Sequence, residues 1–214
     1  MAPQVKICGI KTADALEACV RGGADYVGFV FYPPSPRFLT PQAARDLCAK
    51  HSRVPAKVAL TVNADDALLD EIIHHVSPDY LQLHGSEAPT RVRDVKVRFH
   101  LPVIKAIAIA DAADLETARL YEGAADILLF DAKPLTSEPS LPGGNARSFD
   151  WRVLAGHNWA VPWMLSGGLN AQNVAEAIAV TGALGVDISS GVERIRGEKD
   201  PALITEFLET LSAL

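Results

Sequence analysis

Short apolar runs alternate with longer amphipathic stretches along almost the whole chain of 214 residues. The runs are rich in Val, Ile and Leu and end in small or polar residues, as buried strands of a parallel sheet commonly do. We therefore predict strands over residues 5–10, 26–31, 57–62, 80–85, 103–109, 127–130, 163–165 and 186–188.

The stretches between these runs carry apolar residues at helical spacing, with recognisable start and stop signals. Thr40-Pro41 is one start signal, because threonine is a favoured N-cap and proline suits the first helical position. Gly22-Gly23 is a stop signal. The predicted helices cover residues 13–22, 41–50, 65–76, 89–97, 111–121, 149–156, 170–181 and 201–211.

The alternation breaks between residues 132 and 148, a segment with several prolines and serines and the pair Gly143-Gly144. Loops of this length without structure of their own are usually functional or disordered. We interpret the segment as a mobile lid that follows the sixth strand.

Eight strand–helix units in one chain predict a single-domain (β/α)8 barrel over residues 1–214, at the small end of the size range for that fold. The alternative is a doubly wound open sheet, which usually has fewer strands and a G-x-G-x-x-G motif after the first one. The first strand here is followed by only one glycine, Gly9, so the barrel is favoured.

Composition and charge narrow the function classes. Hydrophobic residues make up 49% and charged residues 21%, with a net charge of −6 and no basic tract, which argues against nucleic-acid binding. Three cysteines without paired spacing predict neither a disulfide framework nor a zinc site. We find no signal peptide, and no apolar run reaches the roughly 20 residues of a membrane span. We therefore expect a cytoplasmic protein without a membrane partner.

In (β/α)8 barrels the active site lies at the carboxyl ends of the strands. Polar groups occur at or near most of the predicted strand ends, which favours a site at one mouth. They are Cys8, Arg37, Asn63, His84, Lys105, Asp131, the segment Ser166-Gly167-Gly168 and the segment Ser189-Ser190-Gly191.

The glycine–serine segments after the last two strands favour a phosphate site, because barrels of this kind commonly bind phosphate there. Glycine lets the backbone approach the ligand closely, and exposed N–H groups attract an anion. Small residues at these positions are also compatible with simple tight turns. The order of the two segments on a barrel favours phosphate binding by Gly167, Gly168, Ser189, Ser190 and Gly191.

The other candidates each allow two interpretations. Cys8 is either a packing residue, as free cysteines usually are, or a base that needs nearby positive potential to act near neutral pH. Asp131 either caps a turn or serves as a general acid. Arg37, in a proline-stiffened loop, either binds a carboxylate or is a surface arginine. His84 either binds a ligand or is a polar side chain that only fills the end of the barrel. A single histidine at the mouth argues against a metal site.

Seven sequence blocks resemble phosphoribosylanthranilate isomerases, in the same order from near residue 5 to near residue 193. The blocks are KICGI at 6–10, VGFVFYP at 27–33 with SPR at 35–37, LQLHG at 81–85, LFD at 129–131, FDW at 149–151, SGGLN at 166–170 and VDISSGVE at 186–193. Each block alone is modest, but the ordered set is specific.

The resemblance implies an Amadori rearrangement of N-(5-phosphoribosyl)anthranilate in tryptophan biosynthesis, without metal, flavin or nicotinamide. It implies Asp131 as the acid, Cys8 as the base and Arg37 as the group that binds the anthranilate carboxylate. It also implies that His84 and Asp187 face the sugar or the aromatic ring, and we expect Gly9 to leave room for the sugar beside the thiol. The expected partner is this small molecule, and the chain is expected to be a monomer or a homodimer.

Three alternatives remain open from the sequence. An indole-glycerol-phosphate synthase would carry catalytic lysines and a longer N-terminus, whereas Lys105 is a lone candidate. A histidine-pathway isomerase would have an aspartate in place of Cys8. A non-catalytic sugar-phosphate sensor would need the phosphate site but not the pair formed by Cys8 and Asp131.

Overall fold

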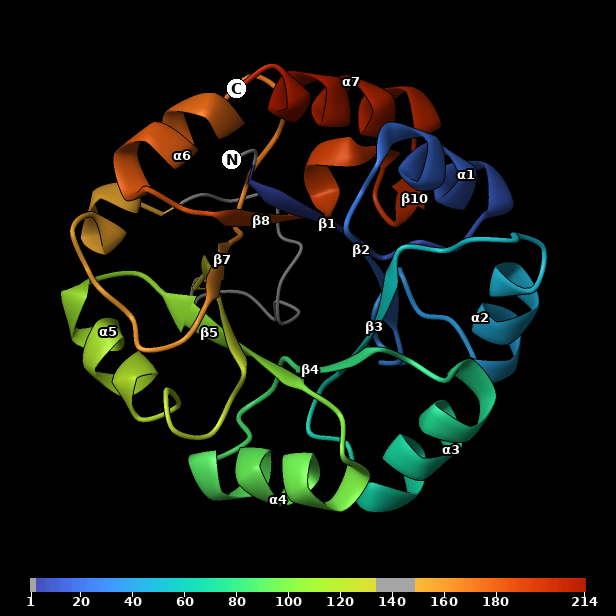
Figure 1. Ribbon diagram of the computed structural model, residues 1–214, viewed down its shortest axis with the longest axis horizontal. Coiled ribbons are helices and arrows are strands. Elements are labelled where there is room, and N and C mark those ends of the chain that lie inside the picture. Colours follow the sequence, from blue (N-terminus) through green and yellow to red (C-terminus); the bar gives the residue numbers. More distant parts are fainter. Residues whose placement is uncertain (1–2, 134–148) are drawn as a thin grey trace.

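The centre of the computed structural model, which describes residues 3–133 and 149–214, is a closed barrel of parallel strands in chain order (Figure 1). Closure follows from β1, which pairs with β2 on one side and with β8 on the other. The predicted barrel is therefore confirmed, and the open sheet is excluded. The strands are β1 (Gln4–Cys8), β2 (Tyr26–Val30), β3 (Ala56–Thr61), β4 (Tyr80–Leu83), β5 (Val103–Ile109), β6 (Ile127–Ala132), β7 (Trp163–Leu165) and β8 (Gly185–Ile188).

Helices cover the outside of the barrel (Figure 1). Their starts follow the sequence signals, since the side chains of Thr12, Thr40 and Asp65 each accept a backbone N–H of the first helical turn. The helices are α1 (Ala13–Gly22), α2 (Pro41–Cys48), α3 (Asp66–Val76), α4 (Pro89–Phe99), α5 (Ala112–Arg119), α6 (Val174–Thr181) and α7 (Pro201–Ser212), with short 3₁₀ turns η1 (Trp151–Leu154) and η2 (Ser190–Val192).

Some predicted boundaries are wrong for local reasons. β1 ends at Cys8 because Gly9 adopts a positive φ of 86° and leaves the extended conformation. The helix predicted from residue 170 starts at Val174, since the side chains of Asn170 and Asn173 hold a turn before it. Asp131 lies within β6 rather than after it. The predicted lid falls almost wholly on residues 134–148, outside the described residues.

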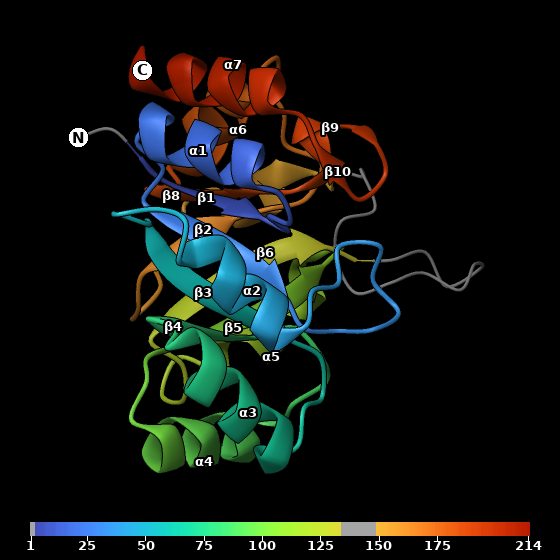
Figure 2. The same ribbon diagram turned by 90° about the vertical axis from the view of Figure 1, so that its right-hand side faces the viewer.

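A short antiparallel hairpin, β9 (Glu193–Ile195) and β10 (Glu198–Lys199), follows β8 and was not predicted. Its strands are too short and too charged to give an alternating apolar pattern, and the chain turns at Gly197, whose φ is 88°. In Figure 2 the hairpin lies at the opposite end of the barrel from the N-terminus, which is the end where the strands finish.

The alternation of side chains along each strand divides the core into two parts. One part lies between the strands and the helices. The other lies inside the barrel and includes Tyr26, Val58, Ile104, Leu129 and Met164. Toward the carboxyl end, the same inward-facing positions become polar. Among the described residues, no helix has the length and apolar character to cross a bilayer.

Candidate active site

A buried ion pair lies in the barrel wall below Cys8. Lys6 on β1 and Asp187 on β8 are register partners, and Lys6 Nζ lies 2.7 Å from Asp187 Oδ1. The Lys6 side chain is 0% exposed, and Ser166 Oγ donates to the other carboxylate oxygen at 3.4 Å. Burial lowers the pKa of Lys6, but the charges of Asp187 and Cys8 outweigh it and raise the pKa above its usual value. Lys6 is therefore charged at neutral pH.

Cys8 is the next inward-facing residue on β1 and is only 4% exposed. Its register partner is Gly28 on β2. A Cβ atom at Gly28 would lie 2.9 Å from Cys8 Sγ and 3.2 Å from Lys6 Nζ, so this glycine leaves space for both groups. Burial raises the pKa of the Cys8 thiol, while Lys6 and Lys199 lower it, and the net shift is upward. The thiol thus has two cations near it that the sequence did not suggest.

From the sequence we expected Gly9 to leave room for a sugar beside the thiol. The structure shows that this expectation is wrong. A Cβ atom there would lie 2.7 Å from Arg37 Cδ and 3.2 Å from Lys199 Nζ. The space is therefore occupied by two side chains of the protein. The missing Cβ and the positive φ of Gly9 instead let Arg37 and Lys199 approach the end of β1.

Glu193 on β9 joins these two cations. Arg37 Nε and Nη2 donate to Glu193 Oε1 and Oε2 at 2.7 and 2.8 Å, the two-pronged geometry that suits a guanidinium and a carboxylate. Lys199 Nζ also donates to Oε1. Burial raises the pKa of Glu193, but the hydrogen bonds and charges of Arg37 and Lys199 outweigh it and lower the pKa to about 2. Arg37 is thus buried and held, rather than a loose surface side chain.

We expect Glu193 to make the folded protein sensitive to acid. Its folded pKa of about 2 lies below the ordinary value of about 4.3, so the carboxylate stabilises the fold fully above about pH 4.3. This contribution is lost as the pH falls toward 2. Glu193→Gln should lower the free energy of unfolding at pH 7 and weaken its dependence on pH below 4.5. Urea unfolding at several pH values measures both effects.

Glu198→Gln on the same hairpin is the matched control, because Glu198 is exposed. It should change neither the free energy of unfolding nor its acid dependence. Equal acid profiles for wild type and Glu193→Gln would contradict the ionised state of Glu193.

Asp131 and His84 meet on the inner side of the barrel. Asp131 Oδ2 lies 3.3 Å from His84 Nε2, and Asp131 Oδ1 accepts the backbone N–H of Ala132 at 2.9 Å. Gln82 Nε2 lies 2.9 Å from His84 Nδ1. If this amide donates to Nδ1, the imidazole proton is on Nε2 and points at the Asp131 carboxylate. Gln82 is a site residue that the sequence analysis missed, although it lies two positions before His84 on the same strand face.

The glycine–serine segments after β7 and β8 pack closely against their neighbours. Gly167 has a φ of 89°, and a Cβ atom there would lie 2.8 Å from the backbone nitrogen of Ala132. A Cβ atom at Gly191 would lie 1.9 Å from the carbonyl oxygen of Leu169. Both glycines are therefore required by the close approach of the loops. Ser189 Oγ donates to the carbonyl oxygen of Cys8 at 3.1 Å, which ties the end of β8 to β1.

The remaining phosphate candidates lie in the same two loops. Gly168 has a φ of 69°, and its carbonyl oxygen accepts from Asn173 Nδ2 at 3.0 Å. Ser190 opens the short turn η2. Phosphate binding by these segments remains a prediction.

One residue that we expected at the mouth has another position. Lys105 faces outward from the barrel, where Nζ donates to Glu87 Oε2 at 2.9 Å and to the carbonyl oxygen of Gly85 at 2.7 Å. Glu87 Oε1 accepts the backbone N–H of Asn63 at 2.8 Å. Lys105 and Asn63 thus hold the loop after β4. The prediction that Lys105 lies at the mouth was wrong, because the alternation of side chains along β5 directs Lys105 away from the barrel interior.

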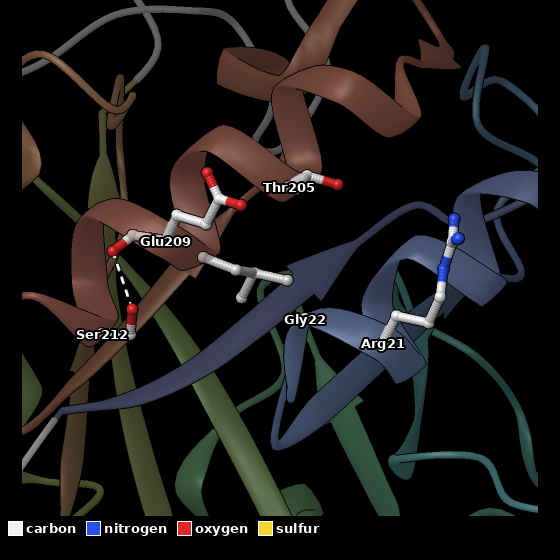
Figure 3. A pocket seen from close by; sticks show the side chains of 6 residues that line it. Arg21, Gly22, Thr205, Glu209 and Ser212 are labelled. Atoms are coloured by element: carbon white, nitrogen blue, oxygen red, sulfur yellow. Dashed lines mark hydrogen bonds between the residues drawn. The ribbon is translucent and has the colours of Figure 1, made fainter.

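A groove of about 450 Å³ lies elsewhere, between α1 and α7 (Figure 3). Arg21 and Gly22 line it from α1, and Thr205 and Glu209 from α7. None of the predicted site residues lines it. Among residues 3–133 and 149–214 there is also no group of three or more His, Cys, Asp or Glu side chains able to hold a metal ion.

A closed (β/α)8 barrel whose carboxyl end gathers buried acidic, basic and thiol groups defines a barrel enzyme. The model of the family described as N-(5′-phosphoribosyl)anthranilate (PRA) isomerase matches residues 5–210. The chain belongs to this family and is an isomerase, which confirms the resemblance drawn from the sequence blocks.

Similar proteins support this assignment along the whole chain. An N-(5′-phosphoribosyl)anthranilate isomerase from Brucella canis is 53% identical over 212 residues, covering 99% of this chain and 95% of the relative. The crystal structure of phosphoribosylanthranilate isomerase from Thermotoga maritima matches with a TM-score of 0.87 and 34% identity, covering 99% and 100% of the two chains. A phosphoribosylanthranilate isomerase in complex with reduced 1-(o-carboxyphenylamino)-1-deoxyribulose 5-phosphate matches with a TM-score of 0.85 and 33% identity, with the same coverage.

Proposed function

We propose that the protein converts N-(5′-phosphoribosyl)anthranilate into 1-(2-carboxyphenylamino)-1-deoxy-D-ribulose 5-phosphate, the Amadori rearrangement of tryptophan biosynthesis. Membership of the isomerase family supports the reaction. The observation that carries the assignment of roles is the presence of Cys8 and Asp131 on the inner side of the barrel near its carboxyl end, each with a polar partner network.

In the proposed mechanism, Asp131 is the acid and Cys8 is the base. Asp131 donates its proton to the furanose oxygen, and the C1′–O bond breaks as the anthranilate nitrogen forms a Schiff base with C1′. Cys8 then takes the proton from C2′, and the electron pair of that bond forms the C1′–C2′ double bond of an enolamine. The enolamine becomes the ketone when a proton returns to C1′ and the C2′ hydroxyl loses its own. General acids and bases typically contribute about 10²–10⁴-fold each.

The other candidates are proposed to bind the two ends of the substrate. Arg37 binds the anthranilate carboxylate, and the phosphate lies against the two glycine–serine loops. His84 faces the sugar and orients Asp131. Asp187, one of whose oxygens is held by the Lys6 ammonium, is proposed to face the sugar or the aromatic ring. The proposed phosphate contacts are Gly167, Gly168, Ser189, Ser190 and Gly191.

We expect Arg37→Ala to raise KM for phosphoribosylanthranilate by at least about tenfold and to change kcat much less, because the carboxylate is bound alike in ground and transition states. Steady-state kinetics measure the split. Arg21→Ala on α1, which is exposed and lines only the distant groove, is the control. An unchanged KM in Arg37→Ala would show that another group binds the carboxylate.

Conversion of phosphoribosylanthranilate, followed by its fluorescence, tests the proposed function directly. The purified protein should consume the substrate, and Cys8→Ser combined with Asp131→Asn should abolish conversion. A sugar-phosphate sensor would bind the substrate without consuming it. Binding without turnover in the wild-type protein would therefore favour the sensor and contradict the proposed reaction.

We also propose a single-domain protein that acts in the cytoplasm as a monomer or homodimer and needs no cofactor. A similar structure, of monomers generated from the dimeric phosphoribosylanthranilate isomerase of T. maritima, has a TM-score of 0.84 and 33% identity with this chain. Light scattering of the purified protein distinguishes the two oligomeric states.

A further inference from the structure

We propose that Lys199 on β10 is a positioning residue that favours the thiolate form of Cys8, the form that a base requires. This inference rests on the proposed role of Cys8 as the base. Lys199 belongs to the hairpin that the sequence did not predict, and it is not part of the acid–base pair.

The position of Lys199 brings its ammonium to the end of β1. Its side chain is 1% exposed, and Nζ lies 3.3 Å from Ser189 Oγ, which in turn donates to the carbonyl oxygen of Cys8 at 3.1 Å. A Cβ atom at Gly9 would lie 3.2 Å from the same Nζ. The ammonium is therefore packed against the peptide that joins Cys8 to Gly9, in surroundings that exclude water.

Lys199 differs from Lys6 in how its charge is matched. Lys6 has its own carboxylate, Asp187, at 2.7 Å, so this pair is neutral in sum. Lys199 shares the carboxylate of Glu193 with Arg37, so this carboxylate is not matched to Lys199 alone. On the described elements around the thiol, the charged and titratable groups include Lys6, Tyr32, Arg37, His84, Asp131, Asp187, Glu193 and Lys199.

The effect of Lys199 on the pKa of Cys8 and the effect of Cys8 on the pKa of Lys199 both agree with this inference. Burial raises the pKa of Cys8, and Lys199 is one of the two cations that lower it. Burial and the charge of Arg37 lower the pKa of Lys199, while Glu193 and Cys8 raise it, and the net shift is downward. Each group thus favours the charged form of the other, as oppositely charged groups at short range do. Lys199 also holds this position through Glu193, which connects it to Arg37.

Titration of the Cys8 thiolate by its absorbance near 240 nm tests the inference without substrate. Each variant is compared with the same variant carrying Cys8→Ala, which removes the signals of Cys19, Cys48 and the tyrosines. Lys199→Met should raise the pKa of Cys8 by about one unit or more, whereas Lys199→Arg should stay close to wild type. Lys133→Met is the matched control, because it removes one exposed lysine just after β6. A Cys8 pKa in Lys199→Met equal to that in Lys133→Met would overturn the inference.

A second variant should shift the Cys8 pKa in the opposite direction. It also tests the inference if Lys199→Met does not fold. Glu193→Gln removes the negative charge between Lys199 and Arg37, so the Cys8 pKa should fall. An unchanged or higher Cys8 pKa in folded Glu193→Gln would also contradict the inference. Circular dichroism and thermal unfolding establish that each variant is folded before titration.

Kinetics distinguish failure of this inference from failure of the proposed function. In Lys199→Met, the pH at which kcat reaches half its maximum should rise by the same amount as the thiol pKa, with about a tenfold lower kcat near neutral pH and recovery at higher pH. If Cys8→Ser abolishes turnover but Lys199→Met leaves the thiol pKa unmoved, the role of Lys199 is wrong. If Cys8→Ser retains turnover, the proposed base is wrong, whatever Lys199 does to the thiol.

Discussion

Cys8→Ser is expected to lower kcat by at least about 10²-fold, with substrate affinity and folding largely retained. Serine has nearly the same shape as cysteine, but its hydroxyl does not ionise in the range in which a thiol does. A buried thiol flanked by Lys6 and Lys199 gains a negative charge far more readily than a hydroxyl at the same place. The substitution therefore removes the proposed base and little else.

The same experiment decides between catalysis and packing. Cys8 contacts Val30 and Leu60 in a small apolar cluster, so a packing role predicts a lower melting temperature with near-normal kcat. A role as the base predicts a much lower kcat with a near-normal melting temperature. Cys48→Ser on α2 is the control cysteine, because it lies outside the barrel and should leave kcat unchanged. Near-normal turnover in Cys8→Ser would remove Cys8 from the mechanism.

The architecture was predictable because the barrel repeats one local pattern. Apolar runs and helix signals set the order of the units, and α1 has the predicted bounds. Closure of the sheet follows from that order. The short hairpin of β9 and β10 carries no such pattern, and with it Lys199 escaped prediction.

The partners within the site depend on contacts between distant parts of the chain. Glu193 lies 156 positions from Arg37, and Asp187 lies 181 positions from Lys6, so no local spacing reveals either pair. Lys6 did carry a local signal, because it is a lone charge in an apolar strand, two positions before Cys8 and hence on the same face. The same alternation along β5 would have predicted that the Lys105 side chain points outward from the barrel.

The space beside Gly9 was correctly predicted from the sequence, but the group that fills it was not. A residue without Cβ beside Cys8 was recognised from the sequence, and it does make space. The space serves Arg37 and Lys199, which come from a loop after β2 and from β10. The identity of neighbours at a strand end depends on loop paths, which sequence patterns do not determine.

Asp131→Asn is expected to lower kcat by at least about 10²-fold, with KM changed much less. The asparagine amide cannot donate an acidic proton to the furanose oxygen, but it can reproduce the contacts of the carboxylate. Its oxygen can accept the N–H of Ala132, as Asp131 Oδ1 does at 2.9 Å. Its nitrogen can donate to His84 Nε2, which requires the imidazole proton to move to Nδ1.

Gln82 can accommodate that proton. Its Oε1 is buried and has no hydrogen-bond partner among residues 3–133 and 149–214, while its Nε2 faces His84 Nδ1. Rotation of the amide by half a turn would direct Oε1 at an Nδ1–H, so the Gln82–His84–Asp131 chain can adopt either tautomer while His84 and Asp131 keep their heavy-atom positions. The same rearrangement suits a protonated Asp131 in the wild-type protein, which is the state that a general acid needs before ring opening.

The kinetic and stability measurements together separate an acid from a structural cap. If Asp131 only caps the end of β6, Asp131→Asn should keep kcat, because the contact with Ala132 survives. If it is the acid, kcat falls while the melting temperature stays close to wild type. Asp46→Asn on α2, an exposed aspartate that contacts Gln42, is the control for loss of a carboxylate and should alter neither quantity. Retained turnover in folded Asp131→Asn would require a different proton donor for ring opening, and His84 would then be the nearest candidate.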